Sequence, residues 1–287
     1  MLTYLFATLA GGANAVSSVL QRKAHRDAPT SATLSWQLLA VLRTPIWLFG
    51  FLGVIAGFLL QAAALSQGPL TVVEPILVIE LPLTLLLAGV LFQRRLNRRE
   101  WIAALVMAAG LAGLLYSLSP TAAAGAHVDA LGWWIGIPLN VALVAALVAQ
   151  AQRGSSARKA ALLGVATGGM FGLTVALMKS MTNALTEDGV AAIFTTWQTY
   201  GMVASGGVAM FLLQSALNAG SLVAAQPGFT ITDPVVSVLW GVFGYGDTVR
   251  SGVFLLLAAL FTAAIAAGAL SLAHSPLVIG DAEVRVG

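Results

Sequence analysis

The chain has 287 residues, of which 59% are hydrophobic and 9% are charged, and it contains no cysteine. A soluble domain carries about 25% charged residues, so the composition excludes an ordinary soluble protein and indicates a polytopic membrane protein. The absence of cysteine excludes disulfides and thiolate metal sites. The net charge is +3, but the basic residues stand in short loops between apolar runs, so no nucleic acid partner is expected.

Nine apolar runs are long enough to cross a membrane as helices. They are continuously apolar rather than alternating, which argues against β-strands. Residues 30–44 and 186–198 are apolar but too short to cross upright, so ten spans are an open alternative. We expect an all-α polytopic membrane protein with about nine transmembrane helices. In chain order the runs cover residues 2–22, 45–66, 71–93, 101–118, 131–151, 160–183, 197–218, 222–245 and 250–272.

Basic residues gather in the loops after the first, third and fifth runs, and acidic residues gather in the opposite set of loops. By the positive-inside rule, this asymmetry places the N-terminus outside and the C-terminal tail, residues 273–287, in the cytoplasm. We therefore expect a multi-pass protein of the cell membrane, either a plasma membrane or a bacterial inner membrane. The basic residues are Arg22, Lys23, Arg26, Arg43, Arg94, Arg95, Arg98, Arg99, Arg153, Arg158 and Lys159.

The chain contains an internal repeat. Residues 58–82 (FLLQAAALSQGPLTVVEPILVIELP) align with residues 211–234 (FLLQSALNAGSLVAAQPGFTITDP) when one residue is deleted. Five spans separate each element from its copy, and an odd number inverts the orientation. We expect residues 1–118 and 158–272 to be inverted four-helix repeats joined by a linker helix in residues 119–157, an arrangement typical of secondary transporters. The repeat matches Gln61 with Gln214, Gly68 with Gly220, Leu70 with Leu222, Pro75 with Pro227, Pro82 with Pro234, and approximately Gly11, Gly12 and Lys23 with Gly168, Gly169 and Lys179.

Three features resemble one family. They are the first helix ending SSVLQRKA (17–24), the proline-containing segments VVEPILVIELP and VAAQPGFTITDP, and the extra helix between four-helix halves. Together they resemble the drug/metabolite transporter (DMT) superfamily, which includes the EamA-like proteins, and within it the nine-span NIPA magnesium-transporter branch. The resemblance implies an alternating-access carrier, with magnesium as one candidate cargo. This chain carries Glu74, Glu80 and Asp233 where NIPA helices carry neutral residues, which favours an organic solute over magnesium.

Two acidic residues lie deep inside predicted spans, where ionisable groups are costly and usually functional. At 1.5 Å per residue, Glu80 and Asp233 lie roughly 14 Å and roughly 16 Å inside their spans, near the middle of a hydrocarbon layer of about 30 Å. The repeat aligns Glu80 with Thr232, beside Asp233, so we expect both acids to reach one central cavity. There they bind a proton or a cation, or the partly hydrated ion if the cargo is magnesium. The alternative is a pair of structural acids that are protonated or internally hydrogen-bonded.

Other polar residues of the spans are candidates for the same path. Glu74 lies only three residues inside its span, so a functional role and simple interfacial exposure are both open. Gln61, Gln214 and Asn14 are expected either to face the substrate path or to form interhelical hydrogen bonds. Lys179 stands near the outer end of its span, where we expect its long side chain to snorkel to the interface.

Four prolines stand beside these polar residues. Pro75, Pro82, Pro227 and Pro234 each remove an intrahelical donor and free a carbonyl one turn back. In a bilayer, such carbonyls need protein or a wet cavity as partner. The prolines therefore predict distorted helices that line a cavity, with packed structural kinks as the alternative.

The predicted function is secondary transport of a small solute, coupled to a proton or cation. The alternatives are a NIPA-like magnesium carrier and a non-transporting membrane scaffold. No enzymatic activity and no cofactor are expected. The chain has no P-loop motif, and its GYGD sequence (244–247), which resembles that of intramembrane aspartyl proteases, falls in a short turn at the outer end of its span and is not accompanied by the Tyr-Asp pair of a second catalytic aspartate. The expected partners are the solute or cation and the lipid bilayer; the oligomeric state, including a homodimer, is left open.

Overall fold

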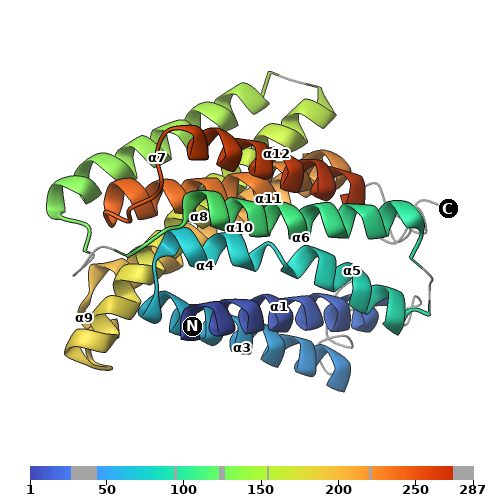
Figure 1. Cartoon of the computed structure of the whole chain (residues 1–287), viewed down its shortest axis with the longest axis horizontal. Helices are drawn as coiled ribbons and strands as arrows, with labels where there is room; N and C mark the ends of the chain where they lie inside the picture. Colours follow the sequence, from blue (N-terminus) through green and yellow to red (C-terminus); the bar gives the residue numbers. More distant parts are fainter. Residues whose placement is uncertain (27–43, 94–95, 123–126, 154, 220–221, 274–287) are drawn as a thin grey trace.

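The structure is a computed structural model that describes residues 1–26, 44–93, 96–122, 127–153, 155–219 and 222–273. In this part of the chain it consists of helices and short connections (Figure 1). The helices are α1 (Leu2–Arg26), α3 (Pro45–Gln67), α4 (Leu70–Leu77), α5 (Glu80–Leu91), α6 (Arg98–Leu118), α7 (Ala130–Ala151), α8 (Ser156–Asp188), α9 (Ala192–Thr195), α10 (Trp197–Ala219), α11 (Leu222–Leu239), the π-helical turn η1 (Trp240–Gly244) and α12 (Val253–Ala273).

Seven helical segments of the described chain are long and apolar enough to cross a membrane, counting α4 and α5 together. They confirm an all-α, multi-pass membrane protein. Helical segments occupy all nine predicted positions, but α1 and the segment Gly228–Gly244 are not among the seven. The count of nine spans therefore stays a prediction. Residues 30–43 and 274–287, which bear on a tenth span and on the C-terminal tail, lie outside the described residues.

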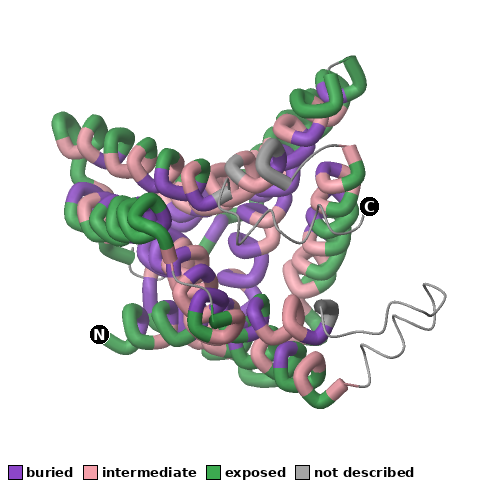
Figure 2. The backbone as a smooth tube through the Cα atoms, turned by 90° about the vertical axis from the view of Figure 1, so that its right-hand side faces the viewer, coloured by how far each residue is buried: buried purple, intermediate pink, exposed green. Residues whose placement is uncertain are grey.

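Helix α8 is the central helix of the bundle. It packs against α10, α11, α7 and α3. Of its most apolar stretch of 18 residues, 72% are buried. Glycines at every fourth position let α11 approach: a β-carbon at Gly164 would lie 2.2 Å from the Ala225 carbonyl oxygen, and one at Gly172 would lie 2.7 Å from Val236 Cβ. Such small-residue ridges let backbones pack closely in membranes. Buried segments accordingly gather in the interior of the bundle, and exposed apolar residues cover its outside (Figure 2).

The predicted span 71–93 is broken into α4 and α5 at Val78 and Ile79. Pro82 has no N–H to donate to the Val78 carbonyl, and Leu81 N donates to that oxygen instead, at 3.2 Å. In the second half, α11 continues through Pro234 and ends in the π-turn η1, where Tyr245 N donates to the Trp240 carbonyl at 3.0 Å. The backbones of the two copies thus differ: the first is interrupted at residues 78–79, and the second is continuous and ends in a π-turn.

The segment 186–198 contains no additional span. Helix α8 extends to Asp188, the chain turns at Gly189 with φ +82°, and α9 is a single helical turn before α10 begins. A positive φ favours glycine, which has no Cβ to clash there.

The basic connections lie at one end of the bundle. The ends of α1, α5 and α7 that carry or precede the arginine-rich sequences lie on the right in Figure 1, and the α3–α4 turn and α9 lie on the left. Arg250 is an exception near the opposite end, where its guanidinium stacks on Tyr116 and Phe254 and donates to the Tyr116 carbonyl.

Candidate functional site

The centre of the site is a pair of acids, one from each half of the chain. Glu74 lies on α4 and is only 4% exposed, so it is buried rather than interfacial. Gln61 of α3 donates from Nε2 to Glu74 Oε1 at 2.8 Å. Helix α4 packs on α11, and the Glu74 carboxylate acts electrostatically on Asp233 of α11. The structure therefore brings Asp233 together with Glu74.

Helix α11 presents several buried polar atoms without a hydrogen-bond partner in the described chain. They are Gln226 Oε1, Asp233 Oδ1 and Ser237 Oγ; the Ser237 hydroxyl and the Asp233 carboxylate face each other only as a weak contact. At 100° per residue, offsets of seven and eleven residues place all three on one face of α11, within about 40° of each other. Buried polar atoms are nearly always paired in native proteins. These three atoms, one of them on Asp233, lie on the face of α11 that is near Glu74. Their missing hydrogen bonds therefore indicate that a proton, water or small ligand binds here.

Glu80 belongs to a different group of contacts. It begins α5, directly after the helix break, and accepts a hydrogen bond from Ser18 Oγ of α1 at 3.3 Å. Asn14 of α1 also bonds to the Glu80 side chain. The described contacts thus join Glu80 to α1 and do not join it to Asp233. The single-helix geometry assumed for residues 71–93 did not include the break at residues 78–79.

The three predicted polar residues are placed differently from one another. Gln61 and Asn14 both hydrogen-bond to acids, Glu74 and Glu80 respectively. Asn14 Oδ1 also lies against α3, where a β-carbon at Gly57 would stand 2.0 Å from it. Gln214 is exposed on α10 and does not join either group.

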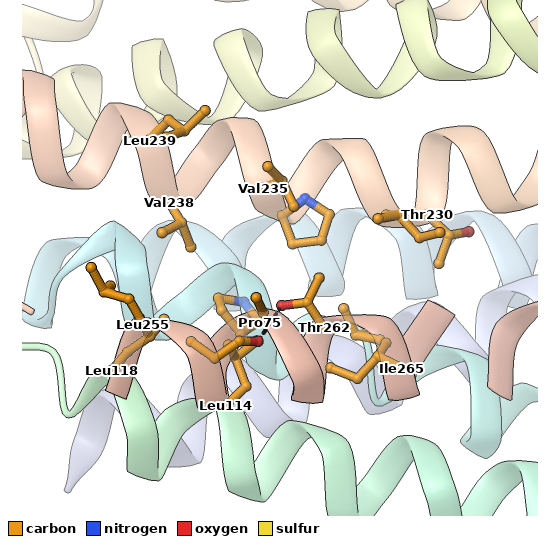
Figure 3. Close-up of a pocket in the computed structure, with 15 residues that line it drawn as sticks. Pro75, Leu114, Leu118, Thr230, Val235, Val238, Leu239, Leu255, Thr262 and Ile265 are labelled. Carbon is orange, nitrogen blue, oxygen red and sulfur yellow. Dashed lines mark hydrogen bonds between the residues drawn. The ribbon is translucent and has the colours of Figure 1, made fainter. Parts of the chain in front are cut away.

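A cavity of about 360 Å³ lies between α4, α6, α11 and α12 (Figure 3). It is lined by Pro75 and Pro234, the residues that directly follow the two central acids, and by mainly apolar side chains with the hydroxyls of Thr230 and Thr262. Thr262 Oγ1 already donates to the Ala258 carbonyl at 2.9 Å.

Neither Glu74 nor Asp233 lines this cavity. The acids and the cavity therefore occupy adjacent faces of the same two helices. Of the other predicted prolines, Pro82 is buried and does not line the cavity, and the side chain of Pro227 lies outside the described residues.

A third polar group was missed by the sequence reasoning. Lys179 of α8 is only 7% exposed, and its Nζ donates to the carbonyl oxygens of Leu65 and, at 3.0 Å, of Gly68. The expectation that Lys179 snorkels to the interface is therefore wrong. These carbonyls end α3, which lacks further intrahelical donors there, so the ammonium finds its partners inside the protein.

Asp247, in the loop between η1 and α12, faces the same turn. Its Oδ2 accepts hydrogen bonds from Thr71 N at 3.2 Å and from Thr71 Oγ1 at 2.9 Å. Burial raises the pKa of the Asp247 carboxyl, and the hydrogen bonds from Thr71 and the charge of Lys179 oppose that shift. No feature of the sequence indicated this contact.

The described residues contain no group of three or more histidine, cysteine, aspartate or glutamate side chains that could hold a metal ion. A magnesium ion retains several waters and is often bound by one or two carboxylates. The Glu74–Asp233 pair offers two carboxylates inside the apolar spans.

Fold and buried polar residues together define a multi-pass helical membrane protein with acids inside its spans. The chain is 30% identical over 251 residues to an uncharacterized protein of Corynebacterium glutamicum, a match that covers 86% of this chain and 86% of that protein. The chain belongs to the same family as this Corynebacterium protein. No protein-family model matches the sequence, and no solved structure matches it.

Proposed function

We propose that this protein is a secondary transporter of the drug/metabolite type, which moves a small solute across the membrane by alternating access. The observation that carries the proposal is the meeting of Glu74 and Asp233 inside apolar spans, with Asp233 Oδ1 buried and unpartnered. Ionisable residues inside transmembrane segments are expensive and mark ion or substrate pathways. Two adjacent carboxylates in an apolar interior are costly, and a carrier has a use for them because they can bind an ion.

We propose further that residues 1–118 and 158–272 are inverted repeats. Matched packing supports this: α1 packs on α3 as α8 packs on α10, and the counterparts α6 and α12 pack on each other, as do α4 and α11. In a two-fold arrangement, equivalent elements meet at the axis. The Glu74–Asp233 pair lies between α4 and α11, at the meeting of the two halves, where carriers of this type hold their substrates and ions.

The proposed role of the pair is to bind the coupling proton or cation. Two like charges held together in an apolar interior repel each other and lack the water that would screen them. A proton or a cation removes that repulsion. When the site opens to water on the other side, the ion can leave, and its binding is thereby linked to the conformational change.

The cavity favours an organic cargo. Its volume of about 360 Å³ lies in the range of about 300–1,000 Å³ typical of small-molecule sites, which are mainly apolar with a few polar groups. No carboxylate lines it, whereas magnesium requires oxygen ligands. The magnesium carrier is kept as an alternative that would use the acid pair instead.

The proposed orientation follows the charges. The basic end of the bundle, on the right in Figure 1, faces the cytoplasm by the positive-inside rule, and the C-terminal tail follows on that side. The end that carries the α3–α4 turn then faces outward.

The function is tested with purified protein in liposomes loaded with a pH-sensitive dye. Neutral organic solutes, organic cations and magnesium are added in turn, and proton movement that depends on the added solute is recorded. We expect at least one organic solute to drive proton movement that Glu74→Gln and Asp233→Asn each abolish, and that Gln214→Ala leaves unchanged because Gln214 is exposed on α10. Full activity of both acid variants would remove the pair from the mechanism.

A further inference from the structure

Two buried residues of opposite charge from the second half of the chain hold the turn between α3 and α4 of the first half. Lys179 donates hydrogen bonds to the carbonyls at the end of α3. Asp247 accepts hydrogen bonds from the amide and the hydroxyl of Thr71 at the start of α4. Both side chains are almost fully buried, at 7% and 4% exposure. Every one of these bonds crosses from one half of the chain to the other.

The lysine sits where a cation is most favourable. The last carbonyls of a helix have no intrahelical donor, and the helix dipole gives that end a partial negative charge. Lys179 Nζ supplies donors to Leu65 and Gly68 at this point. Gly68 is also tightly enclosed by α1, because a β-carbon there would lie 2.3 Å from Thr3 Cγ2.

The aspartate acts as a helix cap supplied from a distance. The N-cap residue of α4 is Pro69, which makes no side-chain capping bond. A carboxylate is the favoured partner for amides at a helix N-terminus. Asp247, 176 residues further along the chain than Thr71, fills this role through two hydrogen bonds.

The aspartate is itself held in place by the second half. Tyr245 donates from its hydroxyl to the Ala176 carbonyl of α8 at 2.6 Å and shares a hydrogen bond of 2.7 Å with Ser180 Oγ. Asp247 N donates to the Gly241 carbonyl at 2.8 Å. Lys179 and Asp247 thus belong to the second half of the chain, and the α3–α4 turn of the first half is hydrogen-bonded to them.

We propose that Lys179 and Asp247 form a gate at the end of the bundle opposite the basic loops, closed in this structure, which releases the α3–α4 turn when the carrier opens to that side. The inference rests on the proposed transport function, because it requires the two halves to move apart. A cap within one half would survive such a movement, whereas these bonds would break.

The open state does not leave the gate residues in an apolar environment. When the halves separate at this end, water reaches the ammonium, the carboxylate and the freed backbone groups, and replaces the bonds that were lost. Burial of either charge without its partners would be costly. The gate therefore has two arrangements in which its polar groups are satisfied, as a two-state element requires.

The test uses the absence of native cysteine. Ser237→Cys is nearly isosteric and places a reporter at a fully buried position, one turn from Gly241, whose β-carbon position lies 2.6 Å from Thr71 Cγ2. Intact cells are treated with a membrane-impermeant maleimide, and the labelling rate is measured. We expect Lys179→Met and Asp247→Asn to raise the rate at least about tenfold, because each removes one side of the gate.

The matched control is Asp129→Asn. Asp129 is an exposed aspartate that caps its own helix through Gly132 N at 2.7 Å, so the rate should not change. Thr71→Val removes one of the two bonds to Asp247 while leaving both charges in place, and should give an intermediate rise. It carries the test if the charge variants fail to fold. A second reporter, Ala166→Cys, is fully buried in α8 and should stay unlabelled unless the protein unfolds.

An unchanged labelling rate in Lys179→Met, Asp247→Asn and Thr71→Val, both in intact cells and after the membrane is permeabilised, would contradict the gate and leave these residues as static helix caps. Labelling reports opening and requires no transported solute. Failure of solute-driven proton movement would therefore contradict the proposed function alone, and unchanged labelling would contradict the gate alone.

Discussion

Gly168 of α8 lies so close to Asp233 of α11 that a β-carbon at Gly168 would stand 2.8 Å from the Asp233 backbone nitrogen. The first half contains a matching contact, in which a β-carbon at Gly11 would stand 2.9 Å from Ile79 Cγ2 and 3.6 Å from Glu80 N. The sequence repeat aligns these glycines with each other and places Glu80 beside Asp233 in register. In each half, therefore, a glycine of another helix lies against the backbone beside the acid.

Substitution Gly168→Ala should destabilise the protein. Its β-carbon would meet the backbone of α11 at 2.8 and 2.9 Å, so the two helices must separate, and overpacking of this kind costs about 1–3 kcal/mol. This outweighs the gain of up to about 1 kcal/mol in helix propensity. Thermal unfolding in detergent measures the loss. Gly207→Ala on α10 is the control, because nothing lies within 4 Å of its β-carbon position; equal melting temperatures for the two variants would refute the close approach.

The pairing of acids makes a specific prediction about stability. Asp233→Asn removes one of two neighbouring buried carboxylates, so it should leave the melting temperature unchanged or raise it while abolishing coupled transport. Glu74→Gln should behave in the same way, and solute exchange, which needs no coupling ion, should be the same in the double variant as in either single variant, since residues that act as a unit are not additive. A loss of exchange that appears only in the double variant would indicate that the two acids act separately.

Magnesium provides a test of the cargo. A ligand that binds only the folded protein raises its stability with the logarithm of concentration above the dissociation constant. We expect no saturable rise in melting temperature with magnesium, because no carboxylate lines the cavity. A saturable, magnesium-specific rise that disappears in Asp233→Asn would favour the magnesium carrier instead. Calcium serves as the control for general effects of divalent salts.

The proposed orientation predicts which cysteines an external reagent can reach. Asp129→Cys, at the exposed start of α7, should be labelled in intact cells. Glu283→Cys, in the predicted cytoplasmic tail, should be labelled only after the membrane is permeabilised. The reverse pattern would invert the topology and place the Lys179–Asp247 gate on the cytoplasmic side.

The positions of the helices could be predicted from the sequence because length and continuous apolarity determine which segments cross a bilayer. The direction in which a side chain points could not. Glu80 follows the interruption at residues 78–79 and accepts a hydrogen bond from Ser18 of α1, and the sequence of this segment does not predict that partner. The partners of Lys179 are backbone carbonyls more than a hundred positions away, and no local sequence pattern predicts such a contact.

Asp247 illustrates the same limit. The sequence places it in a short turn and names no partner, whereas the fold brings Thr71 from 176 positions earlier in the chain to its carboxylate. Gln214 shows the opposite case, because the repeat pairs it with Gln61 but the fold leaves it exposed on α10. Sequence similarity between repeats therefore predicted the elements of the site better than it predicted their individual contacts.

The central claim is that the Glu74–Asp233 pair binds the coupling ion of a carrier. It is tested most directly by comparing two activities of Asp233→Asn in liposomes, with a solute that the wild-type protein transports. Exchange of labelled for unlabelled solute requires only alternation between the two open states, whereas accumulation against a gradient also requires the coupling ion. We predict that Asp233→Asn retains exchange and loses proton-driven accumulation. Accumulation at the wild-type level in Asp233→Asn would contradict the claim.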